Sequence, residues 1–319
     1  MDTATAELDP FVHPALFYRG DREYLQATLP FIRGGLAAGE PVAVAVPERN
    51  LRLLRTWLGP QASSVCFLDM TREGRNPGRI IPAVLRAFAD PHEGRRVRIL
   101  GEPVWPGRSV TEYPACLQHE ALVNLAFPGR AVTIMCPYDA DALEPGVVRD
   151  AETTHPVLLD GSGLRVSDAY APERAIRDAN RVLPDPERAE ALDFGGPRNG
   201  ERFGVRELAR AREFAVGHAA RAGLRGERLG DLRMIAGELV ANSLDHGGGR
   251  GVLRVWAEGG QVVMDVRDAG HITDPLVGRR PVDARRRGAC GLLVTNLLSD
   301  LVRVHTGEGG TTVRVYFTI

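Results

Sequence analysis

The sequence contains no lysine, and its 40 basic side chains are all arginines. This absence excludes a Walker A loop, because that motif needs a lysine to reach the phosphates of a nucleotide. It also excludes catalysis through a lysine Schiff base. Any nucleotide site in this chain must therefore be built from other residue types.

Cysteine is scarce too, since Cys66, Cys116, Cys136 and Cys290 lie far apart and form no Cys-x-x-Cys pair. That spacing disfavours a zinc ribbon or a disulfide framework and is typical of a reducing compartment. No apolar run reaches the roughly 18 residues of a transmembrane helix. The first nine residues lack the basic start and apolar core of a signal peptide. We therefore expect a cytoplasmic protein that does not contact a membrane.

The chain does contain enough apolar material for two domains, because 44% of its 319 residues are hydrophobic. Its net charge of −1 gives no global field that would attract nucleic acid. The first half alternates strand-like and helix-like segments, which predicts an α/β domain with a parallel sheet over residues 1–160. The expected strands are residues 41–46, 65–68, 96–100 and 131–136, and the expected helices are residues 21–35, 50–58, 82–89 and 110–126.

A change of composition separates this half from the rest of the chain. Residues 161–200 are charged and punctuated by proline and glycine, which predicts an interdomain linker with one short helix at residues 173–181. Residues 201–319 predict a second domain, in which helices on one face of a mixed sheet make a two-layer α+β fold. Its expected helices are residues 205–222, 229–245 and 292–301, and its expected strands are residues 251–257, 261–267, 301–305 and 311–317.

One helical run in the second domain carries polar residues at a regular spacing. Glu238, Asn242 and His246 are four residues apart, so they share one face of the helix. A carboxylate and a carboxamide aligned in this way offer oxygen ligands for Mg²⁺ and a base beside a polyphosphate. The same stripe also fits a solvated helix face, and the segments that follow it shift the balance towards a site.

Three glycine-bearing segments follow the stripe. Asp268-Ala-Gly270 places a carboxylate at a strand end, where it can accept a hydrogen bond from the exocyclic amine of adenine. The glycine lets the base approach the backbone. Gly288-Ala-Cys-Gly291 lies directly before a predicted helix, whose first backbone N–H groups form an anion site. Gly309-Gly-Thr-Thr312 precedes the last expected strand.

With the stripe and these segments in this order, residues 203–319 resemble the GHKL (Bergerat-fold) ATPase superfamily. Within it they resemble the anti-sigma-factor serine kinases of the RsbW-like type, which often form homodimers. The resemblance implies that Asn242 coordinates Mg²⁺, that Glu238 is the base activating the attacking nucleophile, and that Asp268 binds adenine. The other residues it implies at the ATP site are His246, Gly270, Gly288, Gly291, Leu292, Thr311 and Thr312.

Two segments depart from the family pattern. Gly270 is followed by His271 where the family has a further glycine, and the segment that contains Cys290 is poorer in glycine. Both departures bear on nucleotide affinity and leave open whether the domain still transfers phosphate. His246 equally fits a helix cap before the glycines 247–249. A histidine kinase shares this fold, but the preceding helix carries only His218, without the acidic neighbour and proline of a phospho-acceptor site.

The first half resembles a different family, the MEDS or DcmR-like sensory domains, which have a RecA-like α/β fold. The matching parts are His13-Pro-Ala-Leu-Phe-Tyr18, Gly101-Glu-Pro-Val-Trp105, Cys136-Pro-Tyr-Asp139, Glu112, Glu120 and Asn124. Cys116, His119 and Glu120 also fall on one expected helix. A Cys-x-x-His without a second pair predicts core packing there rather than a metal site.

Together the two resemblances predict a transcription regulator in which a sensory domain controls an ATP-binding anti-sigma factor that acts in a stress response. The expected cofactors are ATP and Mg²⁺, and the expected reaction transfers a phosphoryl group to a serine or threonine of an anti-sigma-factor antagonist. The expected partners are a sigma factor and that antagonist, without direct contact to nucleic acid. The alternative is a switch module that binds these partners through a degenerate ATP site and transfers no phosphate.

Overall fold

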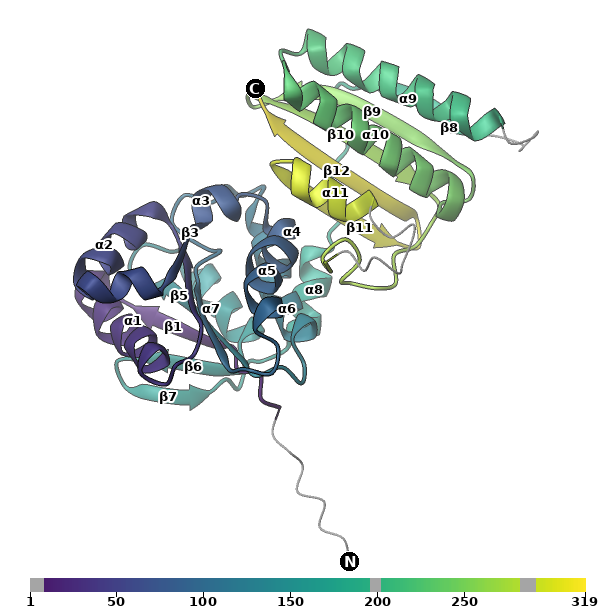
Figure 1. Cartoon of the computed structure of the whole chain (residues 1–319). Coiled ribbons are helices and arrows are strands. Elements are labelled where there is room, and N and C mark those ends of the chain that lie inside the picture. The colour runs from purple at the N-terminus through teal and green to yellow at the C-terminus, as the bar shows by residue number, and fades with distance from the viewer. Residues whose placement is uncertain (1–8, 196–201, 282–290) are drawn as a thin grey trace, which may run out of the picture. The chain divides into compact units, whose positions relative to one another are not determined.

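The computed structural model describes residues 9–195, 202–281 and 291–319 (Figure 1). The chain forms two compact units, of which the first comprises residues 1–75 and 80–179 and the second comprises residues 76–79 and 180–319. Each unit has its own sheet, and each is described by itself.

The first unit is built on a seven-stranded sheet with the strand order β3-β2-β4-β5-β1-β6-β7. Every neighbouring pair is parallel except β6 and β7. The strands are β1 (Pro14–Tyr18), β2 (Val42–Val46), β3 (Cys66–Asp69), β4 (Val97–Gly101), β5 (Val132–Asp139), β6 (Val157–Asp160) and β7 (Gly163–Val166). This largely parallel arrangement confirms the α/β class that the alternating pattern predicts.

Helices cover both faces of this sheet (Figure 1). Strand side chains alternate between the faces. Leu16 and Met135 share one core with α1 and α2, and Cys136, the neighbour of Met135, points to the opposite face and reaches Glu120 of α6. The helical segments are α1 (Gly20–Ala37), α2 (Glu48–Leu58), η1 (Gly59–Ser64), α3 (Met70–Glu73), α4 (Pro77–Ile80), η2 (Ile81–Arg86), α5 (Ala87–Ala89), η3 (Asp90–His92), α6 (Tyr113–Ala126), α7 (Pro145–Thr154) and α8 (Pro172–Ala179).

The stretch 161–200, whose composition predicts a linker, contains more regular structure than expected. β7 pairs with β6 at the edge of the first sheet, and α8 follows it as the predicted short helix. β8 (Glu190–Gly195) pairs with β9 at the edge of the second sheet. Edge strands need only one neighbour, so polar and glycine-bearing sequences can form them without a buried apolar run.

The second unit has a five-stranded sheet with the order β11-β12-β10-β9-β8. Every pair of neighbouring strands is antiparallel, which corrects the expectation of a mixed sheet. The remaining strands are β9 (Arg250–Glu258), β10 (Gln261–Asp268), β11 (Leu301–Gly307) and β12 (Gly310–Thr318), and the helices are α9 (Arg202–Arg221), α10 (Glu227–His246) and α11 (Gly291–Leu298). The three helices lie on one face of the sheet, which confirms the two-layer α+β class (Figure 1).

The two faces of this second sheet differ in chemistry. The helix-covered face is apolar, with Met264 and Val266 of β10 packed against Leu239 and Val240 of α10. The opposite face buries the carboxylate of Asp265, which is fully inaccessible to solvent. Because β10 residues alternate between faces, a single strand contributes to both environments.

Candidate functional site

The polar stripe predicted from the sequence lies on α10. Glu238 and Asn242 are half-buried, and within the described part of the chain neither side chain has a hydrogen-bond partner. His246 is the last residue of the helix and is exposed, and Gly248 and Gly249 follow with φ values of +85° and +78°. Those left-handed glycines end the helix directly after His246. The α10 stripe thus consists of the Glu238 and Asn242 side chains and, at the helix end, the exposed His246.

The structure brings the start of α11 directly against this stripe. A Cβ placed on Gly291 would lie 2.9 Å from Oε2 of Glu238 and 3.0 Å from Nδ2 of Asn242. Only glycine leaves this space to the two polar side chains. The first N–H groups of α11, including that of Leu292, have no partner within the helix. Gly288 and Cys290 lie outside the described residues.

Asp268 ends β10 and turns the chain into a tight corner against the end of α10. Its carboxylate accepts hydrogen bonds from the Ser243 hydroxyl and from the backbone N–H of Gly270, at 2.8 Å for the latter. A Cβ on Gly247 would lie 2.4 Å from Cγ of Asp268, so a larger residue there would displace the carboxylate. These contacts fix the orientation of Asp268, while each of its oxygens keeps a lone pair for a ligand.

Of the two threonines expected near the adenine end, the structure connects one to this corner. Thr311 pairs with Asp268 across β10 and β12, and its hydroxyl donates to the carbonyl of Gly270 at 2.7 Å. Thr312 points to the opposite face of the sheet because neighbouring strand residues alternate. Thr311 is therefore the residue of the pair that supports the Asp268 corner.

The first unit carries a second set of polar groups at the carboxyl ends of its parallel strands. Glu102 follows β4 directly and is 2% exposed, and Nδ2 of Asn50 donates to its carboxylate at 2.8 Å. Burial, followed by the nearby charge of Asp139, raises the pKa of Glu102 to about 8, although the Asn50 hydrogen bond acts to lower it. The ring of Tyr18, the last residue of β1, packs against that of Tyr24 of α1 at an interplanar angle of 59°. Ligands of open α/β sheets bind at this edge.

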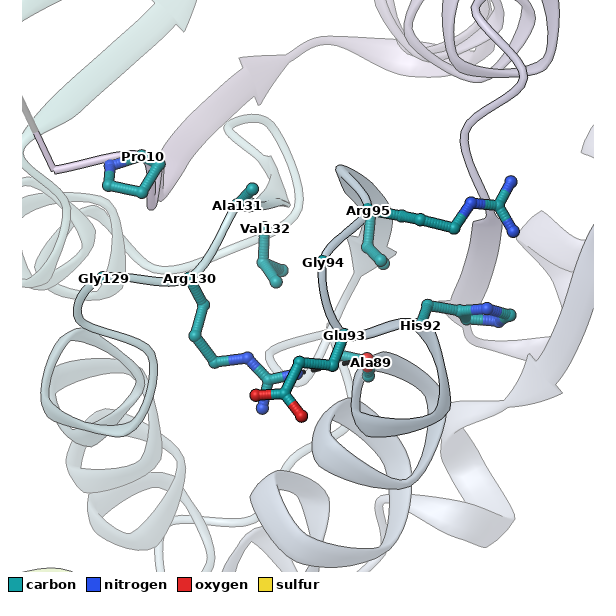
Figure 2. Close-up of a pocket in the computed structure, with 11 residues that line it drawn as sticks. Pro10, Ala89, His92, Glu93, Gly94, Arg95, Gly129, Arg130, Ala131 and Val132 are labelled. Atoms are coloured by element: carbon teal, nitrogen blue, oxygen red, sulfur yellow. Dashed lines mark hydrogen bonds between the residues drawn. The ribbon is translucent and has the colours of Figure 1, made fainter.

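A pocket at the other end of the same sheet has a weaker claim (Figure 2). It lies at the amino-terminal ends of β4 and β5, where Val97 and Val132 line it. Its Arg130 pairs with Asp90, and Nη2 of Arg95 donates to a backbone carbonyl at 2.7 Å. Because its cations are already engaged and it lies at the wrong strand ends, we assign no ligand to it.

The comparisons with known proteins agree with this division of the chain. Residues 12–156 match the family described as MEDS, the methanogen/methylotroph DcmR sensory domain. Residues 204–317 match the histidine kinase-like ATPase domain family. The chain thus consists of a MEDS domain followed by a histidine kinase-like ATPase domain. A comparison with curated proteins gives no match.

The residues that match the ATPase domain family include the α10 stripe, the Asp268 corner and the start of α11. In the MEDS domain, β1 ends at Tyr18 and α1 begins at Gly20, so a single residue joins them. That connection leaves no room for a phosphate-binding loop of the Walker A kind. Among the helices that the structure describes, none is long and apolar enough to cross a membrane.

The MEDS domain also holds a polar group that the sequence prediction missed. Cys116 and His119, which the sequence places with Glu120 on α6, are buried in the domain. Glu120 instead meets His13, Cys136 and His155, which come from three other parts of the chain. His13 and Cys136 belong to the segments that resemble the MEDS family, so that resemblance was the available signal for two of the three.

The raised pKa of Glu102 predicts how the stability of the MEDS domain depends on pH. The unfolded carboxyl ionises near its ordinary pKa of 4.5, whereas the folded one stays protonated up to about 8. Its stabilising contribution is therefore full below pH 4.5 and is lost as the pH rises towards 8. Glu102→Gln cannot ionise and still accepts the Asn50 hydrogen bond. We expect its melting temperature to exceed that of the wild type at pH 8 and the difference to shrink at pH 5, and an equal difference at both values would contradict this.

Proposed function

We propose that this protein is an ATP-dependent anti-sigma-factor regulator whose MEDS domain controls the ATPase domain. The observation that supports the nucleotide site is the close approach of the Glu238 carboxylate and the Asn242 carboxamide to Gly291 at the start of α11, since neither group has a partner among the described residues. A helix start and two uncommitted oxygen-bearing side chains are the elements that a magnesium-bound polyphosphate requires.

Each residue of the site has a role in this proposal. Asn242 coordinates Mg²⁺ and Glu238 is the base for the attacking nucleophile. The start of α11, with the Leu292 amide, holds phosphate. Asp268 accepts the amine of adenine, and Thr311 supports it through Gly270. The proposed reaction transfers the terminal phosphoryl group of Mg·ATP to a serine or threonine of an anti-sigma-factor antagonist.

A histidine kinase reaction fits the geometry less well. His218 lies in α9, and its ring packs against that of Phe214 with the ring centroids 4.4 Å apart and the planes tilted by 42°. Burial and the nearby Arg221 lower the pKa of this histidine. A phospho-accepting histidine has to leave its own ATPase domain and enter an active site, which a side chain packed within α9 does not favour.

Two variants test the roles of the stripe residues. Asn242→Ala removes the magnesium ligand, and we expect the affinity for Mg·ATP to fall by about tenfold or more in titration calorimetry. Glu238→Gln keeps the shape and the hydrogen-bonding capacity, so it should bind Mg·ATP within about threefold of the wild type while phosphotransfer falls by about 10²- to 10⁴-fold. Undiminished Mg·ATP binding by Asn242→Ala would refute the nucleotide site.

The same measurements separate the kinase from a switch module that only binds its partners. Labelled ATP is incubated with the full-length protein and with anti-sigma-factor antagonists encoded in the same genome. A kinase labels a serine or threonine of one antagonist, and Glu238→Gln abolishes that label. If the wild type binds Mg·ATP but labels no antagonist, the departures after Gly270 have removed catalysis and the switch module is correct.

A further inference from the structure

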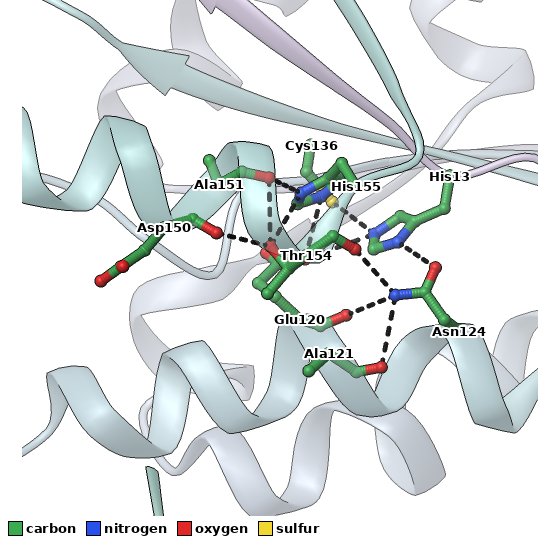
Figure 3. A network of polar contacts seen from close by, with 9 residues as sticks. All are labelled: His13, Glu120, Ala121, Asn124, Cys136, Asp150, Ala151, Thr154 and His155. Carbon is green, nitrogen blue, oxygen red and sulfur yellow. Dashed lines mark hydrogen bonds and ion pairs between the residues drawn. The ribbon is translucent and has the colours of Figure 1, made fainter. Parts of the chain in front are cut away.

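Four buried side chains of the MEDS domain converge on one point between α6 and the sheet (Figure 3). His13 precedes β1, Glu120 lies on α6, Cys136 lies on β5 and His155 follows α7. Their ligand atoms all lie within 4.8 Å of one another, and each residue is at most 2% exposed. Residues from four different parts of the chain are thus held together out of contact with solvent.

The hydrogen-bond partners of His13 fix which of its nitrogens carries the proton. Asn124 uses its amide nitrogen to donate to the carbonyl of Thr154 at 2.8 Å, which turns its amide oxygen towards Nδ1 of His13 at 3.1 Å. Since that oxygen can only accept, Nδ1 of His13 must be the donor. In the neutral ring, Nε2 then keeps its lone pair, and it faces the carboxylate of Glu120 at 3.3 Å.

His155 is held in the same way. Its Nδ1 lies 2.9 Å from the backbone carbonyl of Ala151 and 3.0 Å from the Thr154 hydroxyl. The carbonyl can only accept a hydrogen bond, so Nδ1 again carries the proton. Its Nε2 lies 3.2 Å from the same carboxylate oxygen of Glu120 that His13 faces. Neither oxygen of Glu120 nor Nε2 of His155 makes a hydrogen bond with proper geometry to any described residue.

In the neutral rings, the lone pairs of Nε2 of His13 and Nε2 of His155 therefore face the lone pairs of the Glu120 carboxylate. Two imidazole nitrogens, a carboxylate and the Cys136 sulfur surround one point. The Cys136 thiol, a weak donor, lies 3.4 Å from Nε2 of His13, whereas the Glu120 oxygens and Nε2 of His155 have no hydrogen-bond partner among the described residues. Such a group is costly to bury unless a positive charge lies among its members. Either a proton on His155 pairs with Glu120 while the Cys136 thiol donates to His13, or a metal ion supplies the positive charge.

We propose that His13, Glu120, Cys136 and His155 form a four-coordinate site for Zn²⁺ in the MEDS domain. Metal–ligand bonds of roughly 2.0–2.3 Å in a tetrahedron put neighbouring ligand atoms about 3.3–3.8 Å apart. Three of the six separations, at 3.2, 3.3 and 3.4 Å, are close to that geometry, and the other three do not exceed 4.8 Å. Imidazole and thiolate donors favour Zn²⁺ over Mg²⁺ or Ca²⁺, which prefer oxygen ligands alone.

The contacts behind the ligands also fit a metal site. Histidines that bind zinc usually donate their other N–H to a carbonyl or carboxamide oxygen, which orients the ring. Asn124 does this for His13, and the carbonyl of Ala151 does it for His155. Four protein ligands leave no open position, so the zinc has a structural role and joins the start of β1 to α6, β5 and the end of α7. Binding converts the Cys136 thiol to a thiolate and releases one proton to solvent.

Metal content and cobalt spectroscopy test the site in the full-length protein, purified without a histidine tag. We expect about one zinc per chain by elemental analysis. Replacement of the zinc by Co²⁺ should give the intense visible bands of tetrahedral cobalt and a thiolate-to-cobalt band in the near ultraviolet. The Co²⁺ spectrum identifies the ligands directly, so it does not depend on any variant folding correctly.

Variants then assign the ligands. Cys136→Ser should lose the thiolate band and the bound zinc, whereas Cys66→Ser, at an exposed position outside the cluster, should retain both. Asn124→Ala keeps all four ligands but frees the His13 ring, so it should weaken zinc binding by about 10- to 100-fold. Wild-type protein that holds no zinc and gives no tetrahedral cobalt spectrum would overturn the proposal and leave a protonated histidine paired with Glu120. Equal loss of zinc in Cys136→Ser and Cys66→Ser would overturn it as well.

Discussion

Gly291→Ala should weaken Mg·ATP binding by about 10- to 100-fold while the ATPase domain stays folded. The added Cβ would lie 2.9 Å from the Glu238 carboxylate and 3.0 Å from the Asn242 carboxamide. Both contacts are with the ends of flexible side chains, so the backbone need not move. The two side chains have to turn away instead, and the magnesium ligand and the base lose their positions together. Titration calorimetry with Mg·ATP measures the loss.

Gly230→Ala provides a matched control on α10. A Cβ at that exposed position meets no atom within 4 Å, so the substitution tests the change of residue type without the steric effect. We expect unchanged Mg·ATP affinity and a slightly more stable helix, because alanine favours helix over glycine by about 1 kcal/mol. If Gly291→Ala bound Mg·ATP as tightly as Gly230→Ala, the nucleotide would have to lie elsewhere than over the α10 stripe.

The sequence alone predicted the parts of this site that local spacing determines. Glu238 and Asn242 lie on one helix face because a spacing of four residues matches the helical turn. Asp268 and Gly270 lie at a strand end because the apolar alternation of β10 stops there. These features follow from short-range rules, so a single sequence is enough to find them.

Features that depend on pairing between distant segments were not predictable in the same way. The choice between Thr311 and Thr312 depends on the register of β12 against β10, which no local pattern reveals. β1 lies between β5 and β6, but the sequence did not predict it. It is only five residues long and begins with Pro14, and proline usually argues against a strand although the first position of a strand tolerates it. The zinc ligands His13 and His155 are 142 positions apart in sequence number, and only the fold brings their rings to a centroid distance of 4.1 Å.

Asp265→Ala should destabilise the ATPase domain strongly, costing about 3–5 kcal/mol in the free energy of unfolding. The Asp265 carboxylate is fully buried and accepts hydrogen bonds from two arginines. Nε and Nη2 of Arg254 donate at 2.8 and 2.9 Å, and Nε and Nη2 of Arg314 donate at 3.1 and 2.8 Å. Removing the carboxylate leaves the Arg314 guanidinium buried, with the Trp256 ring, the Tyr316 side chain and one backbone carbonyl among its neighbours, and none of these three carries a compensating negative charge.

Asp185, an exposed acidic partner of Arg254, serves as a control that separates the effect of burial from the effect of charge pairing. Asp185 accepts a hydrogen bond from Arg254 at 2.7 Å, but its side chain is 70% exposed. Asp185→Ala should therefore cost less than about 1 kcal/mol, and that cost should shrink at high salt. Urea unfolding of the full-length chain, read by hydrogen exchange in peptides from β10 and β12, confines the measurement to the ATPase domain. Asp265→Ala is expected to lower the free energy of unfolding more than Asp185→Ala because it leaves a buried, unpaired charge on Arg314. Equal losses for the two variants would mean that solvent reaches Arg314 once Asp265 is gone.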